Sequence, residues 1–524
     1  MNSLKYDPSI NSSKAAPISR PFRYYWRLYR SHILVSLCIL PVLVVYVWLI
    51  SFGTWLKWPV VTNYYDQLAT AFEHRSLSLE TKPNQALLAL SDPYDPAERA
   101  GISFLKDASL YKGHYYLYFG PIPALILAVL KYVGLGRLGD QYLVFAFVSG
   151  ILIFQSMLIF KVWRLFFRDI PIWILLVCIL LGGLISPFTW VLTQARIYEA
   201  AASGGEFFFL AGFYFIVTAL ERKCTLARCC FIFGGGVSLA LAIGSRLTQI
   251  LPVGFLTVMI ALLLTQSCRQ NKTLPQAMLM MMLLGSPLVV GMAALGRYNW
   301  ARFHSVFETG LYYQLAGSDL QKYTHVLFSP LYILPNLYDY LFMPPHIYRT
   351  FPFLKPVHGA GASLFSFITL PPVYYNTELT GILVSTPFVL FAGVSILSLA
   401  LKKKNLPGSI NPTGDFYSLQ WLTTGMLGTV LFGFAPLVSF FWVAMHYQID
   451  FIPPLIVLSM IGFWQGHRLT THRPSIHKLY VAGGMILMLV SVVSDILLAF
   501  SAHAATFQKV NPLLWKYLIS IFSR

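Results

Sequence analysis

Residues 62–121 read TNYYDQLATAFEHRSLSLETKPNQALLALSDPYDPAERAGISFLKDASLYKGHYYLYFGP. This stretch is polar and aromatic, whereas the segments on both sides of it are apolar. The whole chain of 524 residues is 56% hydrophobic and 11% charged, and its mean hydropathy is +0.63. A soluble protein carries about twice that charged share. The composition therefore predicts a polytopic membrane protein, with this stretch as a long loop outside the bilayer.

The positive charge follows position along the chain. The formal net charge is +18, but about half of the Lys and Arg residues fall in short loops at one end of the apolar segments. Only four carboxylates fall on that side: Asp7, Asp169, Glu221 and Asp415. The basic residues thus indicate orientation, with a cytoplasmic N-terminus, and we expect no nucleic acid as a partner.

Apolar segments long enough to cross a bilayer recur along the chain, since a crossing takes about 20 helical residues. We predict an all-α bundle of about eleven spans, at residues 32–52, 142–163, 172–193, 200–220, 230–244, 250–266, 276–296, 379–401, 416–435, 449–465 and 479–500. The chain 1–524 is then one membrane-embedded domain with a cytoplasmic N-terminus at 1–31. Residues 53–120 and 297–377 form two long extracytoplasmic loops, and the short apolar stretch 121–134 is predicted as a half-buried helix.

Asp66 is the first candidate for chemistry. Asn63 can cap a helix whose apolar residues have i, i+3, i+4, i+7 spacing: Tyr65, Leu68, Ala69 and Phe72. Asp66 then lies on another face, just above the end of the first span. A first-turn acid that interacts with the helix dipole is the alternative.

Glu199 is the second candidate acid, on the short turn between the third and fourth spans. Because span ends converge in a bundle, Glu199 could face Asp66. The alternative is a local ion pair with Arg196. Arg246 and Arg297 end spans at the same level, and a guanidinium group suits a phosphate. Their alternative is to reach lipid headgroups.

Further residues are candidates for lining a substrate path. Asp107 precedes an aromatic run, and the residues from His446 to Asp450 lie at the outer start of the tenth span. We name as candidate lining residues Tyr65, Asp107, Tyr116, Tyr118, Tyr198, Tyr447 and Asp450. The aromatic rings could equally form an interfacial belt, and the polar groups of the tenth span could be structural.

No cluster with strong metal-ligand spacing, phosphate-binding glycine loop or serine elbow occurs in the sequence. Chemistry driven by a nucleotide is therefore not expected. An enzyme that works outside the membrane without nucleotides needs a pre-activated substrate, and a sugar on a lipid phosphate meets that need.

Several segments resemble the GT-C superfamily of membrane glycosyltransferases. Asp66 in YYDQLATAF has the place of the acid that follows the first span in that superfamily, and Glu199 in RIYEAA has the place of the second acid. YYLYFGPIPALIL resembles the stretch that opens the next apolar segment there. The chain also resembles a group of uncharacterised bacterial members in DPYDPAER, GSRLT and HYQIDFIPP. It departs from the pattern at Asp66-Gln67, where relatives often have two acids, and at His446, where many have Arg.

The resemblance implies transfer of a hexosyl or pentosyl unit from a polyprenyl-phosphate donor to a glycan, lipid or protein acceptor. Asp66 would act as general base, Arg246 or Arg297 would stabilise the leaving phosphate, and Glu199 would position a substrate or join Asp66 on a divalent cation, Mg²⁺ or Mn²⁺. The expected location is a bacterial cytoplasmic (inner) membrane, with the active site facing the cell envelope.

Two other functions fit the same residues. A transporter or lipid-glycan flippase would also need many apolar helices, but such proteins tend to have mid-membrane charges and repeated halves. In this chain most acids lie at span ends, with Asp495 as the main exception. A lipid-linked glycan polymerase or ligase would share the donor and differ in the acceptor.

Overall fold

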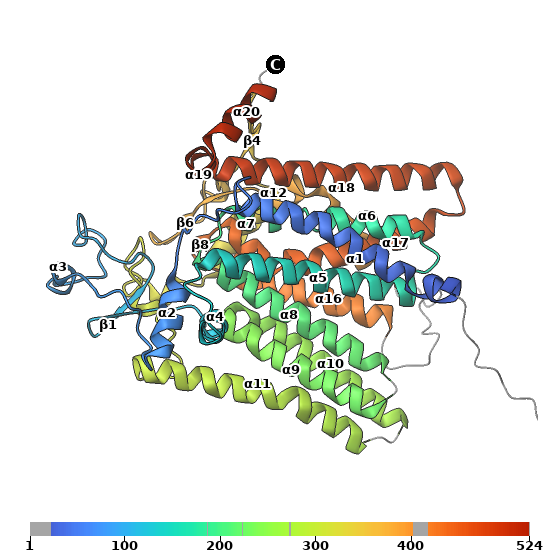
Figure 1. Cartoon of the computed structure of the whole chain (residues 1–524), viewed down its shortest axis with the longest axis horizontal. Helices are drawn as coiled ribbons and strands as arrows, with labels where there is room; N and C mark the ends of the chain where they lie inside the picture. The colour runs from blue at the N-terminus through green and yellow to red at the C-terminus, as the bar shows by residue number, and fades with distance from the viewer. Residues whose placement is uncertain (1–21, 186, 223, 272–273, 402–417, 523–524) are drawn as a thin grey trace, which may run out of the picture.

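The computed structural model describes residues 22–185, 187–222, 224–271, 274–401 and 418–522. Long helices run side by side through the molecule, and the loops gather in a layer at one end of them (Figure 1). The predicted all-α membrane bundle is confirmed. The basic residues predicted at 1–21 and at 402–404, and Asp415, lie outside the described residues.

Within the described ranges, eight helices are long and apolar enough to cross a membrane, by length and composition. They are α1 (Phe22–Ile50), α5 (Asp140–Phe166), α8 (Ile197–Glu221), α9 (Thr225–Ser245), α10 (Ile250–Asn271), α11 (Leu274–Phe303), α16 (Leu419–Val438) and α18 (Pro474–Ala502). α5, α8, α9, α10, α11 and α18 each contain a whole predicted span, and the predicted spans 32–52 and 416–435 fall largely in α1 and α16. In Figure 1, α18 and α11 lie at opposite edges of the bundle.

The other three predicted spans have a different form. Residues 172–193 contain two short helices, α6 (Ile172–Gly182) and α7 (Phe188–Thr193), because glycines and Pro187 interrupt the helix. Residues 379–401 contain α14 (Ile382–Ser385), the 3₁₀ helix η5 (Pro387–Phe391) and α15 (Ala392–Ala400), with the break just before Pro387. Residues 449–465 fall largely in α17 (Ile452–Thr470). A count of eleven spans therefore stays a prediction.

Small residues bring the central helices close together. A Cβ atom on Gly235 of α9 would lie 2.8 Å from Ile216 Cγ1 and 3.4 Å from the carbonyl oxygen of Gly212, both on α8. Membrane helices gain van der Waals contact where such residues face each other. α8 also packs on α5, where Phe147 contacts Phe207 and Phe208. α8 thus lies at the centre of the bundle, and its first turn carries Glu199.

The first long loop begins with α2 (Tyr64–Glu73), which lies across the ends of the long helices beside α4 (Ile122–Tyr132) (Figure 1). Both helices were predicted. Asn63 is not the expected side-chain cap. Asp140 of α5 accepts hydrogen bonds from the backbone N–H groups of Tyr64 and Tyr65 (3.3 and 3.2 Å) and from Thr62 Oγ1 (2.5 Å). The helix start is therefore satisfied by a residue from another element.

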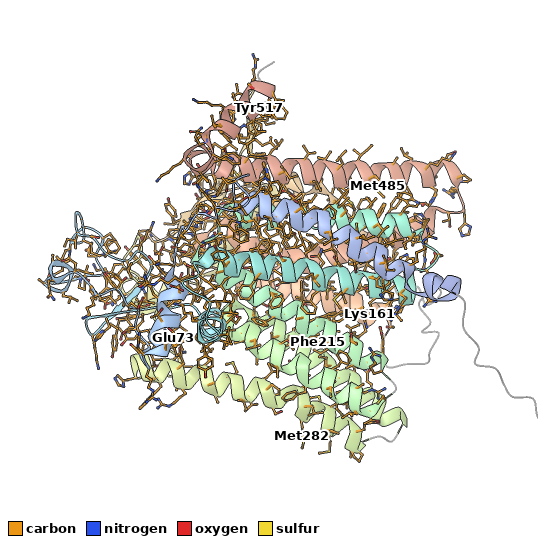
Figure 2. All side chains as sticks on the ribbon, viewed as in Figure 1. Glu73, Lys161, Phe215, Met282, Met485 and Tyr517 are labelled. Atoms are coloured by element: carbon orange, nitrogen blue, oxygen red, sulfur yellow. The ribbon has the colours of Figure 1, made fainter. Side chains whose placement is uncertain are left out.

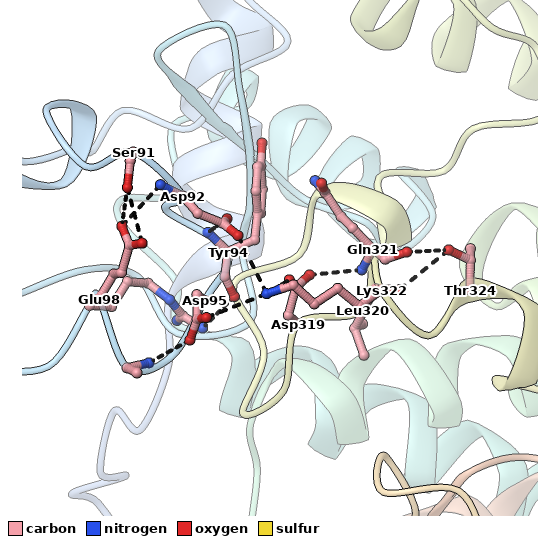
Figure 3. A network of polar contacts seen from close by, with 12 residues as sticks. Ser91, Asp92, Tyr94, Asp95, Glu98, Asp319, Leu320, Gln321, Lys322 and Thr324 are labelled. Atoms are coloured by element: carbon pink, nitrogen blue, oxygen red, sulfur yellow. Dashed lines mark hydrogen bonds and ion pairs between the residues drawn. The ribbon is translucent and has the colours of Figure 1, made fainter.

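The aromatic run of the first loop forms a hairpin of β1 (Ser109–Tyr111) and β2 (His114–Tyr116). The two loops are joined at several points. Ser109 pairs with Gln314, and Lys322 lies 2.9, 3.4 and 3.7 Å from the carboxylates of Asp319, Asp95 and Asp92 (Figure 3). Four short strands of the second loop and its neighbours form two further pairs: β5 (Val357–His358) with β7 (Glu378–Leu379), and β6 (Tyr375–Asn376) with β8 (Trp442–Val443).

Other parts of the loop layer are helical. The second loop contains α12 (Ile333–Phe342) and a β3–β4 pair, His346–Ile347 with Leu354–Lys355. Two helices after α18, α19 (Ala504–Val510) and α20 (Pro512–Phe522), were not predicted. Phe507 and Trp515 of these helices pack in an aromatic cluster with Phe351 of the second loop.

Candidate functional site

A cavity of about 610 Å³ opens at the loop end of the bundle, and we call it the loop-end cavity. Its walls come from both long loops, the turn before α8, the end of α9 and the segment between α16 and α17. The lining residues that can interact with a charged or polar substrate include Asp107, Arg196, Tyr198, Arg246, His446 and Tyr447. The cavity therefore brings together chain segments that are more than 300 residues apart.

Asp107 presents a carboxylate at the wall of this cavity. Its backbone has φ 60°, in the left-handed region that Asp tolerates better than most residues. Asp107 Oδ1 accepts a hydrogen bond from Gln314 Nε2 (3.1 Å), and Oδ2 accepts one from the hydroxyl of Tyr198. The Asp107 N–H donates to the carbonyl oxygen of Leu315 (3.1 Å). Uncharged donors from the second loop and from α8 thus orient the carboxylate.

Glu199 lies behind the wall, fully buried. The Arg196 guanidinium donates to it through Nη2 (2.9 Å to Oε1) and Nε (3.3 Å to Oε2), and the Arg196 N–H donates to Oε2 (3.2 Å). The local ion pair that the sequence left open is therefore present. Since Arg196 itself lines the cavity, Glu199 holds that guanidinium at the wall.

His446 connects these groups. Its ring stacks on Tyr198 with the centroids 5.5 Å apart, and its Nδ1 lies 3.9 Å from Glu199 Oε1. Burial, together with Arg196 and Arg246, lowers the pKa of His446 well below its usual value. The imidazole is therefore neutral at physiological pH. The cavity wall therefore has a neutral ring at this position.

Arg246 lines the cavity and is held by Asp450. Its Nε and Nη2 atoms each lie 3.1 Å from Asp450 Oδ2, which also accepts from Thr248 Oγ1 (2.9 Å). The Arg246 guanidinium lies over the Tyr447 ring, with its carbon 5.1 Å from the centroid. Asp450 is not among the lining residues, so it acts on the cavity through Arg246.

Asp66 has different surroundings. Its Oδ1 lies 2.9 Å from Lys131 Nζ on α4 and accepts a hydrogen bond from the Leu138 N–H (3.1 Å). Asp66 is only 3% exposed, and it does not line the loop-end cavity. α4 packs across the face of α2 that carries Asp66, so this carboxylate is covered. Asp66 and Glu199, which we expected to face each other, have separate partners.

The remaining candidates divide in the same way. Tyr118, Tyr198 and Tyr447 line the cavity with Asp107 and Arg246. Tyr65, Tyr116 and Arg297 do not line the cavity. Tyr65 is fully buried, and the ring of Tyr116 packs against that of Phe303 with the centroids 5.4 Å apart. The guanidinium carbon of Arg297 lies 5.1 Å from the centroid of the Trp300 ring.

Sequence reasoning missed Gln314 and Lys131. Gln314 was not singled out as a site residue, and its contact with Asp107 gives it a role. Lys131 lies in the last turn of a predicted helix. Its ion pair with Asp66 could not be predicted, because the two residues are far apart in the chain.

The acids near the cavity do not form a metal site. Asp107 is bound by hydrogen-bond donors, and Glu199 and Asp450 are bound by arginines. Within the described ranges, no group of three His, Cys, Asp or Glu side chains could hold a metal ion. The residues present therefore do not fit the Mg²⁺ or Mn²⁺ that the resemblance allowed, and we derive no step through a metal.

No protein-family model matches the sequence, and no curated protein is similar to it. Among solved structures, it is similar to the oligosaccharyltransferase of Archaeoglobus fulgidus in the apo form, with a TM-score of 0.51 and 12% identity over 95% of this chain and 60% of that chain. ArnT from Cupriavidus metallidurans, bound to undecaprenyl phosphate, has a TM-score of 0.41 and 12% identity over 91% of this chain and 79% of that chain. This chain thus spans about 60% of the length of the archaeal enzyme. The GT-C-like fold that the resemblance implied is confirmed.

Proposed function

We propose that this protein is a membrane glycosyltransferase that moves a sugar from a polyprenyl-phosphate donor to an acceptor at the extracytoplasmic face. The observation that carries the proposal is the loop-end cavity, where a carboxylate (Asp107) and a guanidinium (Arg246) line one space. A glycosyl transfer from a lipid phosphate needs both kinds of group. The GT-C-like fold supports the same reaction class.

Asp107 serves as the general base in this proposal. It takes the proton from an acceptor hydroxyl or amine, and the acceptor then forms a bond to the anomeric carbon of the donor sugar. The bond from that carbon to the phosphate oxygen breaks, its electron pair stays on the phosphate, and the configuration inverts. We favour Asp107 over Asp66 because Asp107 faces the cavity, whereas Asp66 is bound to Lys131.

Arg246 stabilises the negative charge on the leaving phosphate. Removal of one such donor commonly lowers kcat by about 10²- to 10³-fold. The aromatic rings of Tyr118, Tyr198 and Tyr447 offer apolar faces and hydroxyl groups to the sugar and to the first isoprene units. Glu199 positions Arg196 in this scheme and does not touch the substrate.

The test is sugar transfer in proteoliposomes that contain the purified protein and a radiolabelled polyprenyl-phosphate sugar. Arg246→Lys keeps the positive charge beside Asp450 but loses the bidentate contact of the guanidinium with the phosphate. It should therefore lower the rate of sugar transfer by about 10²-fold. Arg297→Lys is the matched control, because Arg297 lies outside the cavity, and it should retain the rate of the unsubstituted protein.

The rival functions predict other results. A transporter or flippase would move a labelled solute or lipid-linked glycan across the membrane without forming a new glycosidic bond. A lipid-linked glycan polymerase or ligase would transfer the sugar only when a glycan acceptor is present. Translocation with no transfer to lipid, glycan or peptide acceptors would reject the glycosyltransferase.

A further inference from the structure

A second cavity, of about 460 Å³, lies between α1, α5 and α8, and we call it the basic cavity. Its charged lining residues are Lys161, Arg164, Arg222 and Glu221, and His32 lies beside them. Lys161 marks its position near the end of α5, at the end of the bundle opposite the loop layer (Figure 2). The charge pattern of the sequence predicts this end as cytoplasmic.

The cations of this cavity outnumber its acids. Glu221 Oε2 lies 2.9 Å from Lys161 Nζ and 3.7 Å from Arg164 Nη2, so a single carboxylate oxygen faces both cations. Arg222 adds a third positive charge, and among the described residues that line the cavity Glu221 is the only acid. The charged lining residues therefore have a formal charge of +2.

Lys161 lies inside the bundle, whereas the side chains of Arg164 and Arg222 lie at its edge. Lys161 is 6% exposed, and its ammonium group also lies 5.2 Å from the centroid of the Tyr214 ring. Ordinary interfacial lysines extend their ammonium group into water. Burial of an ammonium group in a span is costly, and an anion beside it offsets that cost. Excess positive charge around a buried lysine thus points to an anionic occupant.

The apolar side chains of the cavity indicate which anion. Met157 lies one helical turn before Lys161 on α5, and Phe160 packs edge-on against His32 with centroids 4.7 Å apart. Arg164 follows Lys161 by three residues, toward the end of the helix. A phosphate group would contact the cations, while attached acyl chains would contact the apolar side chains. Free phosphate would use only the first part.

We propose that the basic cavity binds the phosphate headgroup of an anionic phospholipid. Basic pockets between membrane helices on the cytoplasmic side are suited to such headgroups. This site is separate from the loop-end cavity, so it does not depend on the glycosyl-transfer reaction. It would place one lipid between the first span and the central helices.

The experiment is native mass spectrometry of the purified full-length protein with dioleoyl phosphatidylglycerol, dioleoyl phosphatidylcholine or inorganic phosphate. We expect retention of phosphatidylglycerol over phosphatidylcholine. Arg164→Gln combined with Arg222→Gln should weaken phosphatidylglycerol binding by at least about tenfold. Arg168→Gln is the control, because this exposed arginine lies two residues after the end of α5 but does not line the cavity.

Glu221→Gln gives a result of the opposite sign. It removes the negative charge that Glu221 contributes to the cavity, so it should strengthen phosphatidylglycerol binding by about fivefold, which a misfolded protein would not do. Equal loss in the Arg168→Gln control, equal retention of phosphatidylcholine, or full displacement of the lipid by millimolar phosphate would each overturn the proposal.

Discussion

Asp66 and Asp107 belong to the same long loop, yet they have opposite surroundings. Asp66 is bound by a buried lysine and a backbone N–H where α2 crosses α4. Asp107 is bound by a tyrosine hydroxyl and an amide group, and it faces a cavity. A carboxylate paired with a cation in a closed contact contributes to folding, whereas one held by uncharged groups at a cavity can accept a proton. The role of each acid is therefore inferred from the groups that bind its carboxylate, and not from how close the acid lies to the first span.

The largest effect is expected at the cavity. Asp107→Asn keeps the size and hydrogen-bonding ability of the side chain but cannot accept the acceptor's proton. A general base commonly contributes about 10²- to 10⁴-fold, so transfer from the polyprenyl-phosphate donor should fall by that factor. The melting temperature in detergent should stay close to that of the unsubstituted protein. Full activity in this variant would remove Asp107 from the mechanism.

A smaller change, in stability, is expected at the α2–α4 contact. Asp66→Asn leaves Lys131 buried without a carboxylate, and loss of one partner of such a pair costs about 3–5 kcal/mol of unfolding free energy. The double variant Asp66→Asn, Lys131→Met removes both charges and should recover much of that loss. Chemical denaturation and the transfer assay measure the two properties separately.

That double variant also discriminates between the two acids. If Asp66 is only structural, the stabilised double variant transfers sugar at a rate close to that of the unsubstituted protein. If Asp66 is the base, as the resemblance implied, the double variant is folded but inactive. The second outcome would reverse the assignment made from the cavity.

The smallest effect concerns pH. Burial lowers the pKa of His446, so below the ordinary value of 6.5 the unfolded chain binds a proton that the folded chain does not. Stability is therefore full above about pH 6.5 and falls as the pH drops below it, by at most about 2 kcal/mol at pH 5. His446→Gln should reduce this slope in melting curves. His503, whose pKa burial lowers to about 3, should leave a residual slope.

An unchanged slope in His446→Gln would show that the cavity wall does not set the acid sensitivity of the protein.

Local patterns predicted much of the bundle. Long apolar segments predicted each of the eight candidate membrane helices. The spacing of Tyr65, Leu68, Ala69 and Phe72 predicted α2. These signals depend on neighbours within two turns, so a single sequence contains them. The Arg196–Glu199 ion pair could also be predicted from the sequence, because the two residues are three positions apart.

The site depended on contacts that no local pattern contains. Asp140 satisfies the start of α2 from more than 70 residues away, and Lys131 covers Asp66 from 65 residues away. Asp107 acquires Gln314 from the second loop, 207 residues along the chain. Sequence reasoning could name Asp107 and Arg246 as candidates, but only the fold shows that they line one cavity.

The strand pairing at Trp442 and Val443 affects the order in which parts of the protein fold. Ser109 of the first loop pairs with Gln314 of the second loop, and Tyr375 and Asn376 pair with Trp442 and Val443, so the loop layer joins segments that are synthesised at different times. Contacts between such distant segments form late, because a long chain must be closed first. The early helices can therefore insert while the loop layer above them is still open. The loop-end cavity is complete only once the segment after α16 has emerged, so premature termination before that point would leave inserted helices without this cavity.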